Sequence, residues 1–246
     1  MEFFPQALEL ALSKTAERDG TFKLSFYPRA LNSARALSML KKGEVDVIWT
    51  MSDPERERDF IPVRISLLRG LSSHRIFLIR AEDRQKFASV KNLDQLRQFT
   101  AGVGALWPDT DVLRANDLPV TTASSYELLF NMLIGKRFDY IPRGLYEVWD
   151  EFEIHKDRGL VIEESLMLHY KGPNYFFVNR NNPALAERID RGLRLAIEDG
   201  SLDALFMSFS SFSKGMAVME NPNRRLFHLK TPSEMAERKV SHSDAH

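Results

Sequence analysis

Apolar and polar positions alternate along the chain in two different periods. In residues 2–20, Phe4, Leu8 and Leu12 lie on one stripe, which predicts an amphipathic helix. Residues 22–28 are apolar at every second position and end at Pro28, which predicts a half-buried strand. A second helix is expected to end at Gly43, and a strand is expected to follow up to Trp49.

The same order of elements recurs in the middle of the chain. Residues 74–80, HRIFLIR, form an apolar run typical of a buried strand. Asn92 is expected to cap a short helix, Pro108 to occupy the first position of the next helix, and Ser124 or Ser125 to cap a third. Helices that alternate with strands in this way indicate an α/β fold.

Composition narrows the choice of function. The 246 residues fit one large domain or two smaller ones, and 34 Lys and Arg against 34 Asp and Glu give no net charge. We therefore expect no nucleic-acid partner. The chain has no cysteine, which excludes disulfides and thiolate catalysis but fits either the cytosol or the periplasm. No apolar run reaches the length of a membrane span, so no membrane insertion is expected.

Catalytic and metal-binding signatures are absent from the sequence. It contains no HExxH, GxSxG or P-loop motif, and the GVG at 102–104 is too short for a dinucleotide fingerprint. The six histidines have no short metal-ligand spacing; they are His74, His155, His169, His228, His242 and His246. We expect no catalytic residue, no metal and no cofactor.

Several segments appear in an order that resembles the amino-acid-type bacterial extracellular solute-binding proteins. Each segment is weak evidence alone, and the specific feature is their order and spacing over residues 5–207. The segments are GEVDVIW, SDPERE, RIFLIR, SVKNLDQLRQFTAGVG, SSYELLFNMLIGKRFDYIPR and YFFVNRNNPALAERIDRGLRLAIEDGSLDALF. The resemblance implies a two-lobed α/β fold of the type II periplasmic binding protein kind, in which each lobe is a mixed sheet flanked by helices.

The resemblance also implies where the lobes divide. The chain of such proteins crosses twice between lobes through a double hinge, here expected near 79–81 and 174–177. Lobe 1 would comprise residues 1–79 and 177–246, and lobe 2 would comprise residues 80–176. We expect the polar stretch from about residue 231 to be a loose tail.

The family's first strand precedes its first helix, whereas this sequence begins at that helix. We expect the true start to lie upstream, with a signal peptide and the strand before Met1. A periplasmic location follows from that expectation, and a cytoplasmic one would follow if Met1 is the genuine start.

In lobe 1, the resemblance assigns ligand contacts to the segment after the strand that ends near Trp49. Arg56 occupies the place of the arginine that grips the ligand's carboxylate, for which a planar guanidinium is well suited. Thr50 and Ser52 stand where the family presents hydroxyl and amide groups. The alternative is a solvated turn in which Arg56 pairs with Glu55 or Glu57.

In lobe 2, the resemblance points to the start of the helix at Pro108. Trp107 would form an aromatic wall or pack within the lobe, and Thr110 would offer a hydroxyl group. Asp109 would favour the helix dipole but repel an anion. Arg143 stands near the place of the aspartate that holds a ligand ammonium, so an anion or another polar molecule is favoured over an α-amino acid if Arg143 faces the cleft; the alternative is a surface role.

Taken together, these residues predict non-catalytic binding of a small polar solute, amino-acid-like or an organic anion, in a cleft between the lobes. The partners expected are the membrane subunits of an ABC-type importer or a sensor, and the protein is expected to be a monomer. The alternative is a catalytic descendant of the fold, such as a dehydratase or a lytic transglycosylase-like enzyme. Glu55, Asp109 and Glu147 would then have to serve as acid or base.

Overall fold

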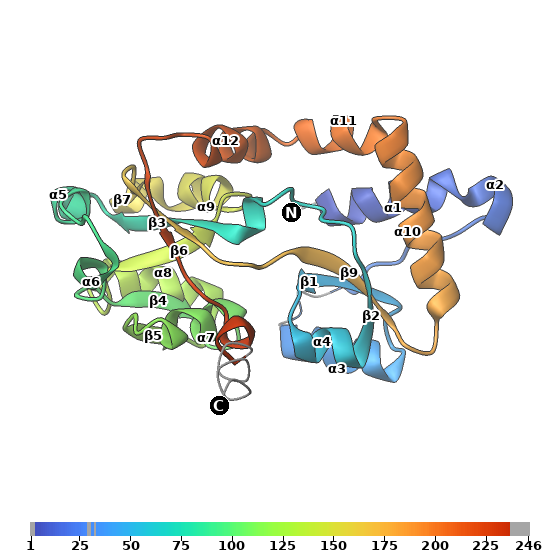
Figure 1. Ribbon diagram of the computed structural model, residues 1–246, viewed down its shortest axis with the longest axis horizontal. Helices are drawn as coiled ribbons and strands as arrows, with labels where there is room; N and C mark the ends of the chain where they lie inside the picture. The colour runs from blue at the N-terminus through green and yellow to red at the C-terminus, as the bar shows by residue number, and fades with distance from the viewer. Residues whose placement is uncertain (1–2, 29–30, 32, 237–246) are drawn as a thin grey trace, which may run out of the picture. The chain divides into compact units, whose positions relative to one another are not determined.

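The computed structural model describes residues 3–28, 31 and 33–236, and its elements are drawn in Figure 1. The chain forms two compact units, each with its own sheet. The first unit contains Met1–Arg69 and Gly172–Ser213, and the second contains Gly70–Lys171 and Lys214–His246. Both units combine sheets with helices, so the α/β fold class predicted from the sequence is confirmed.

The sheet of the first unit has three strands in the order β1-β9-β2. The central strand β9 comes from a distant part of the chain and runs antiparallel to both neighbours, with Trp49 opposite Phe176 and Ile61 opposite Val178. The strands are β1 (Val47–Met51), β2 (Phe60–Val63) and β9 (Asn174–Asn179). The Ser-Asp-Pro sequence after β1 therefore connects two strands that lie on either side of β9.

Helices cover both faces of this sheet. Side chains alternate along β1, so Ile48 joins a core cluster with Leu40 of α3, while Trp49 stacks on Phe4 of α1 with 5.4 Å between ring centroids. Figure 1 shows α3 on one side of the sheet and α10 on the other. The helices are α1 (Phe3–Lys14), α2 (Ala16–Asp19), α3 (Ser33–Lys42), α4 (Pro54–Asp59), α10 (Pro183–Glu198), α11 (Ser201–Met207) and α12 (Ser210–Met219), of which α12 runs on into the second unit.

Two features join the helices of the first unit. Gly192 of α10 lies against α1 so closely that a Cβ atom at residue 192 would stand 1.9 Å from the carbonyl oxygen of Ala11. Phe3 of α1 packs edge-on against rings from the last part of the unit, and its nearest ring partner is Phe212, at a centroid distance of 4.9 Å. The amphipathic helix predicted within residues 2–20 is confirmed over Phe3–Lys14, and a separate short helix follows at Ala16–Asp19.

The strand predicted for residues 22–28 is wrong. Residues 20–28 have no helix or strand, and Phe26 and Tyr27 are 59% and 41% exposed. The alternating pattern is present, but a strand also needs a neighbour to receive its backbone hydrogen bonds. Among the described residues, β1 pairs only with β9 and is an edge strand.

The second unit is built around a seven-stranded mixed sheet. Its main order is β10-β8-β3-β6-β4-β5, and β7 pairs with one end of β3. The strands are β3 (His74–Arg80), β4 (Ala101–Gly104), β5 (Val120–Ala123), β6 (Tyr140–Gly144), β7 (Leu160–Ile162), β8 (Leu166–His169) and β10 (Arg225–His228). Six of the seven residues of β3 are buried, as the apolar run within this segment predicted.

The helix starts predicted in this unit are confirmed. Asn92 accepts a hydrogen bond from the amide of Gln95, Ser125 accepts one from Leu128, and Pro108 occupies the first turn of α7. The α-helices are α5 (Arg84–Ala88), α6 (Leu93–Leu96), α7 (Pro108–Ala115), α8 (Tyr126–Ile134) and α9 (Val148–His155). Short 3-10 turns lie at η1 (Leu71–Ser73), η2 (Ala81–Asp83) and η3 (Lys156–Arg158).

The division into units differs from the boundaries expected from the sequence. The chain passes between units after residues 69, 171 and 213, three times rather than twice. All of β3 belongs to the second unit, because β3 pairs with β6, β7 and β8 there. The last part of the chain also belongs to that unit, because β10 pairs in parallel with β8.

The loose tail expected from about residue 231 is not found in residues 232–236. Residues 232–236 are helical, and Glu234 accepts hydrogen bonds from the amide and the hydroxyl of Thr231 at 2.9 and 3.0 Å. Glu234 also forms an ion pair with Lys171 at 3.0 Å. The rest of the tail, residues 237–246, lies outside the described part of the chain.

Candidate functional site

The first group of candidate residues lies where β1 ends and α4 begins. Asp53 caps α4 with a carboxylate oxygen 2.8 Å from the amide nitrogen of Arg56, and Pro54 occupies the first turn. Proline and a capping aspartate are the residues that begin a helix abruptly. This local sequence therefore fixes Arg56 in the first turn after the strand.

The Arg56 side chain is 11% exposed, and one of its guanidinium nitrogen atoms, Nη1, has partners. Its Nη1 atom donates to the carbonyl oxygen of Met51 at 2.7 Å and lies 2.9 Å from a carboxylate oxygen of Asp53. Within the described residues, its Nε and Nη2 atoms form no hydrogen bond or ion pair. These two atoms form the edge of a guanidinium that binds a carboxylate through two parallel hydrogen bonds.

The next two candidates, Ser52 and Thr50, carry hydroxyl groups that differ in their hydrogen bonding. The Ser52 hydroxyl donates to Glu57 at 2.5 Å, and its amide donates to the carbonyl oxygen of Pro173 at 2.8 Å. Glu57 also forms an ion pair with Arg64, whose Nη2 atom lies 2.5 Å from a carboxylate oxygen of Glu57. Thr50 is half-buried in β1, opposite Tyr175. The structure thus brings Thr50, Ser52 and Arg56 to the same end of β1, with the Ser52 hydroxyl already bonded.

In the second unit, Thr110 serves to close the connection between β4 and α7. It is buried, and its hydroxyl donates to the carbonyl oxygen of Gly104 at 3.0 Å. A Cβ atom at Gly104 would lie 2.5 Å from the Trp107 ring, so the ring packs tightly over the end of β4. The hydroxyl that the sequence analysis offered to a ligand therefore has a partner within its own unit.

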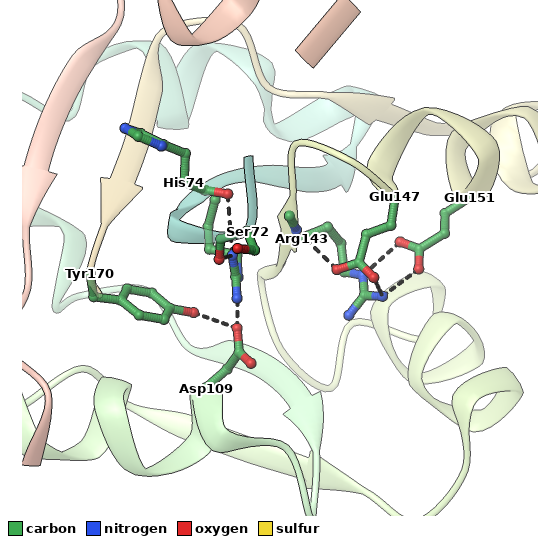
Figure 2. A network of polar contacts seen from close by, with 9 residues as sticks. Ser72, His74, Asp109, Arg143, Glu147, Glu151 and Tyr170 are labelled. Carbon is green, nitrogen blue, oxygen red and sulfur yellow. Dashed lines mark hydrogen bonds and ion pairs between the residues drawn. The ribbon is translucent and has the colours of Figure 1, made fainter. Parts of the chain in front are cut away.

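Asp109 is part of a buried cluster with Arg75 and Tyr170. Figure 2 labels Asp109 and Tyr170 of this cluster. Arg75 Nε lies 2.8 Å from the Asp109 carboxylate, the Tyr170 hydroxyl donates to the same carboxylate, and the guanidinium lies 4.9 Å from the Tyr170 ring centroid. Burial raises the pKa of Asp109, but the Arg75 charge and the hydrogen bonds from Tyr170 and Arg75 outweigh it and hold the pKa below the ordinary 3.8. The charge of Asp109 is balanced within the unit, so the repulsion of an anion expected from the sequence loses its basis.

The Asp109 carboxylate should make stability depend on pH. Because its pKa is lower in the folded chain, its contribution is fully present above pH 3.8, the ordinary value, and is lost as the pH falls through the folded value. We expect Asp109→Asn to be less stable than the parent at pH 7, with the difference shrinking below pH 3.8. Urea unfolding of both proteins at several pH values measures this, and a difference that stays constant down to acid pH would contradict it.

Arg143 of β6 lies in a second cluster that Figure 2 also shows. Its Nε atom donates to one carboxylate oxygen of Glu151 at 2.6 Å, and its Nη2 atom donates to the other. A carboxylate oxygen of Glu147 lies 2.9 Å from Nη2, and the guanidinium stands 4.4 Å from a ring centroid of Trp107. Burial lowers the pKa of Arg143, but the charges of Glu147 and Glu151 outweigh it and raise the pKa above its ordinary value.

These contacts bear on the two roles considered for Arg143 from the sequence, a surface residue or a cation that faces the ligand. Arg143 is 7% exposed and is flanked by two carboxylates, so it is neither the surface residue nor the unpaired cation considered from the sequence. Its positive charge already has more than its equivalent of negative charge beside it. An anionic ligand would compete with Glu147 and Glu151, and the electrostatic argument for an anion at Arg143 is removed.

Sequence reasoning missed Arg75, Tyr170 and Glu151. Arg75 carried a usable signal, because an arginine inside an apolar strand is seldom buried without a partner. The partner itself, Asp109, comes from another element 34 residues away. Among the described residues, no group of three or more His, Cys, Asp or Glu could hold a metal ion, and no helix there is long and apolar enough to cross a membrane.

The architecture is that of known two-lobed binding proteins. An ancestral arginine-binding protein bound to glutamine matches with a TM-score of 0.66 and 17% identity, over 85% of this chain and 87% of that one. An amino acid ABC transporter substrate-binding protein from Streptococcus pneumoniae, bound to L-arginine, matches with a TM-score of 0.62 and 17% identity, over 84% and 82%. An ancestral amino acid-binding protein that is a precursor of cyclohexadienyl dehydratase matches with a TM-score of 0.60 and 15% identity, over 82% and 84%.

These likenesses define the class to which the fold belongs. The chain has the type II periplasmic binding protein fold, as the sequence analysis predicted. Solved structures that share this fold include a substrate-binding protein of an amino acid ABC transporter. No protein-family model matches the chain, and no curated protein matches its sequence.

Proposed function

We propose that the protein binds a small polar solute that carries a carboxylate, without transforming it, for ABC-type uptake or for sensing. The observation that carries the proposal is Arg56, whose Nε and Nη2 atoms have no partner among the described residues while its Nη1 atom is anchored. A guanidinium fixed in this way has little conformational freedom left to lose when a ligand binds. Thr50 lies at the same end of β1 and supplies a second polar group.

The solved structures of similar fold support a binding role. One of them is bound to glutamine and another to L-arginine, both of which carry a carboxylate. The expected setting is the periplasm, with a monomer as the working form and a transporter or sensor as the partner. In this proposal Asp109, Thr110, Arg143 and Trp107 act as the rigid frame of their own unit. The polar groups of the first three bond within that unit, and the Trp107 ring lies against the Arg143 guanidinium.

An enzyme is the second candidate, and one similar structure is the precursor of a dehydratase. A general acid needs a carboxyl group whose pKa is raised towards neutrality. Asp109 has the opposite property, since its pKa is lowered beside Arg75. Burial raises the pKa of Glu151, but both of its carboxylate oxygens accept hydrogen bonds from Arg143. The binding function is therefore the better supported of the two.

The experiment is a thermal-shift screen of amino acids, dicarboxylates and aromatic acids, followed by titration of Arg56→Ala with the ligand found. A ligand that binds only the folded protein stabilises it by about 2.7 kcal/mol at a hundredfold excess over its dissociation constant. We expect Arg56→Ala to lose this shift, because the paired donors are gone, and Arg56→Lys to recover little of it.

Arg58→Ala is the matched control, since Arg58 lies in the same helix with a side chain that is 70% exposed. Binding by this variant should equal that of the parent. If Arg56→Ala binds as tightly as the parent, the site assignment is wrong. Turnover of a prephenate-like acid would instead favour the enzyme.

A further inference from the structure

Three histidines form a row across the sheet of the second unit. His74 of β3 stands opposite His169 of β8, and His169 stands opposite His228 of β10. Leu168 and Phe227, the residues before two of these histidines, pack with the core cluster of the unit. Because neighbouring side chains of a strand point to opposite faces, the three imidazoles share the other face of the sheet.

The rings of this row are close enough to act together. The Nδ1 atoms of His169 and His228 are 3.2 Å apart, and the ring centroids of His74 and His169 are 4.7 Å apart. His74 Nδ1 lies 2.9 Å from the carbonyl oxygen of Gly70, so this nitrogen carries the proton. His228 is exposed, and His169 and His74 are half-buried.

We propose that His169 and His228 together chelate a divalent late first-row transition metal, with Cu²⁺ bound most tightly. Two imidazole nitrogens on one tetrahedral ion stand about 3.3 Å apart, from metal–nitrogen bonds of about 2.05 Å, and the two Nδ1 atoms already have nearly this spacing. Imidazole is a preferred ligand of Zn²⁺, Ni²⁺ and Cu²⁺, and affinity rises along the series to Cu²⁺.

The exposed side of the pair leaves room for water to fill the other coordination positions. His228 lies on β10, at the edge of the sheet, so its ring can turn from hydrogen bonding to sharing an ion with His169. The charge of Glu234 acts on His169, and Glu234 also forms an ion pair with Lys171 at 3.0 Å. The metal site accordingly has two protein ligands, which is consistent with the absence of a larger ligand group among the described residues.

The alternative is that the two rings only share a hydrogen bond. One nitrogen would then donate to the other, and the pair would contribute packing between β8 and β10 with no affinity for metals. The two interpretations differ in the number of nitrogen atoms that a bound ion contacts and in the effect of removing either ring.

The test uses the whole untagged chain with His242 and His246 replaced by asparagine, so that the end of the chain adds no ligands. Cu²⁺ is added in equal amount, and its electron paramagnetic resonance spectrum reports the nitrogen ligands; Zn²⁺ affinity is measured by calorimetry. We expect one ion per chain with two imidazole nitrogens. His228→Ala should leave one nitrogen and weaken Zn²⁺ binding at least about tenfold, as should His169→Gln.

His74→Gln is the control, because the two ligands in this proposal are His169 and His228, whose Nδ1 atoms face each other. It should keep the two-nitrogen spectrum. Circular dichroism of each variant shows that the fold is kept, and His228→Gln serves where His228→Ala fails to fold. Equal Zn²⁺ affinity in the parent and in His228→Ala, or a spectrum that does not change, would overturn the proposal.

Discussion

Replacing Arg143 with alanine is expected to lower the free energy of unfolding by about 3–5 kcal/mol. The variant would leave Glu147 and Glu151 facing each other without the cation that separates them, and Glu151 is buried. Two uncompensated carboxylates cost more than the lost contacts alone. Unfolding in urea at pH 7, followed by circular dichroism and fluorescence, measures the change.

Two companion variants show whether charge is the cause. Arg143→Met combined with Glu147→Gln and Glu151→Gln removes all the charges of the cluster, and we expect it to regain most of the lost stability. Arg137→Ala removes an exposed arginine shortly before β6 and should change stability by no more than about 0.5 kcal/mol. A loss in Arg143→Ala no larger than in Arg137→Ala would contradict the arrangement in Figure 2.

The second large effect is expected at Gly192, where alanine should lower the free energy of unfolding by about 2 kcal/mol. Alanine favours a helix over glycine by about 1 kcal/mol, so the sign of the effect depends on packing. The new Cβ atom would stand 1.9 Å from the Ala11 carbonyl oxygen, so α1 and α10 must separate, at a cost of about 3 kcal/mol. The same unfolding assay measures the net result.

A double variant tests the cause, because the clash is with a backbone atom. Ala11→Gly removes only a side chain and should not rescue Gly192→Ala. Arg194→Ala, at a position of the same helix whose side chain is 62% exposed, is the matched control and should have little effect. A Gly192→Ala protein that is more stable than the parent would mean that the two helices are not in such close contact.

Local sequence patterns correctly predicted features, such as helix caps, that depend only on residues close together in the chain. The caps at Asn92 and Ser125 and the first-turn proline at Pro108 were confirmed, because a cap depends on residues within one turn. The order of segments predicted the fold class. The strand expected at residues 22–28 was wrong, because pairing depends on a neighbour that the pattern itself does not specify.

The candidate residues show the same limit. The sequence placed Arg56 at the end of β1, but it could not show which of its nitrogen atoms are occupied. Arg143 was identified as unusual, yet Glu151, which decides its charge balance, was missed. His169 and His228 are 59 residues apart and become neighbours only when β8 pairs with β10, so spacing along the chain gave no signal.

The strand order has a consequence for how the protein is made. The central strand of the first unit, β9 (Asn174–Asn179), is synthesised long after its neighbour β1 (Val47–Met51). In the second unit, β10 joins the sheet only after β9 and α10–α12 have been translated. Neither sheet can be completed on the ribosome until its late strand has emerged. Until then β1 and β2 lack the strand that joins them, and the exposed edge of β8 is open to a wrong partner. Both sheets are therefore expected to form more slowly than sheets built from strands that are neighbours in sequence.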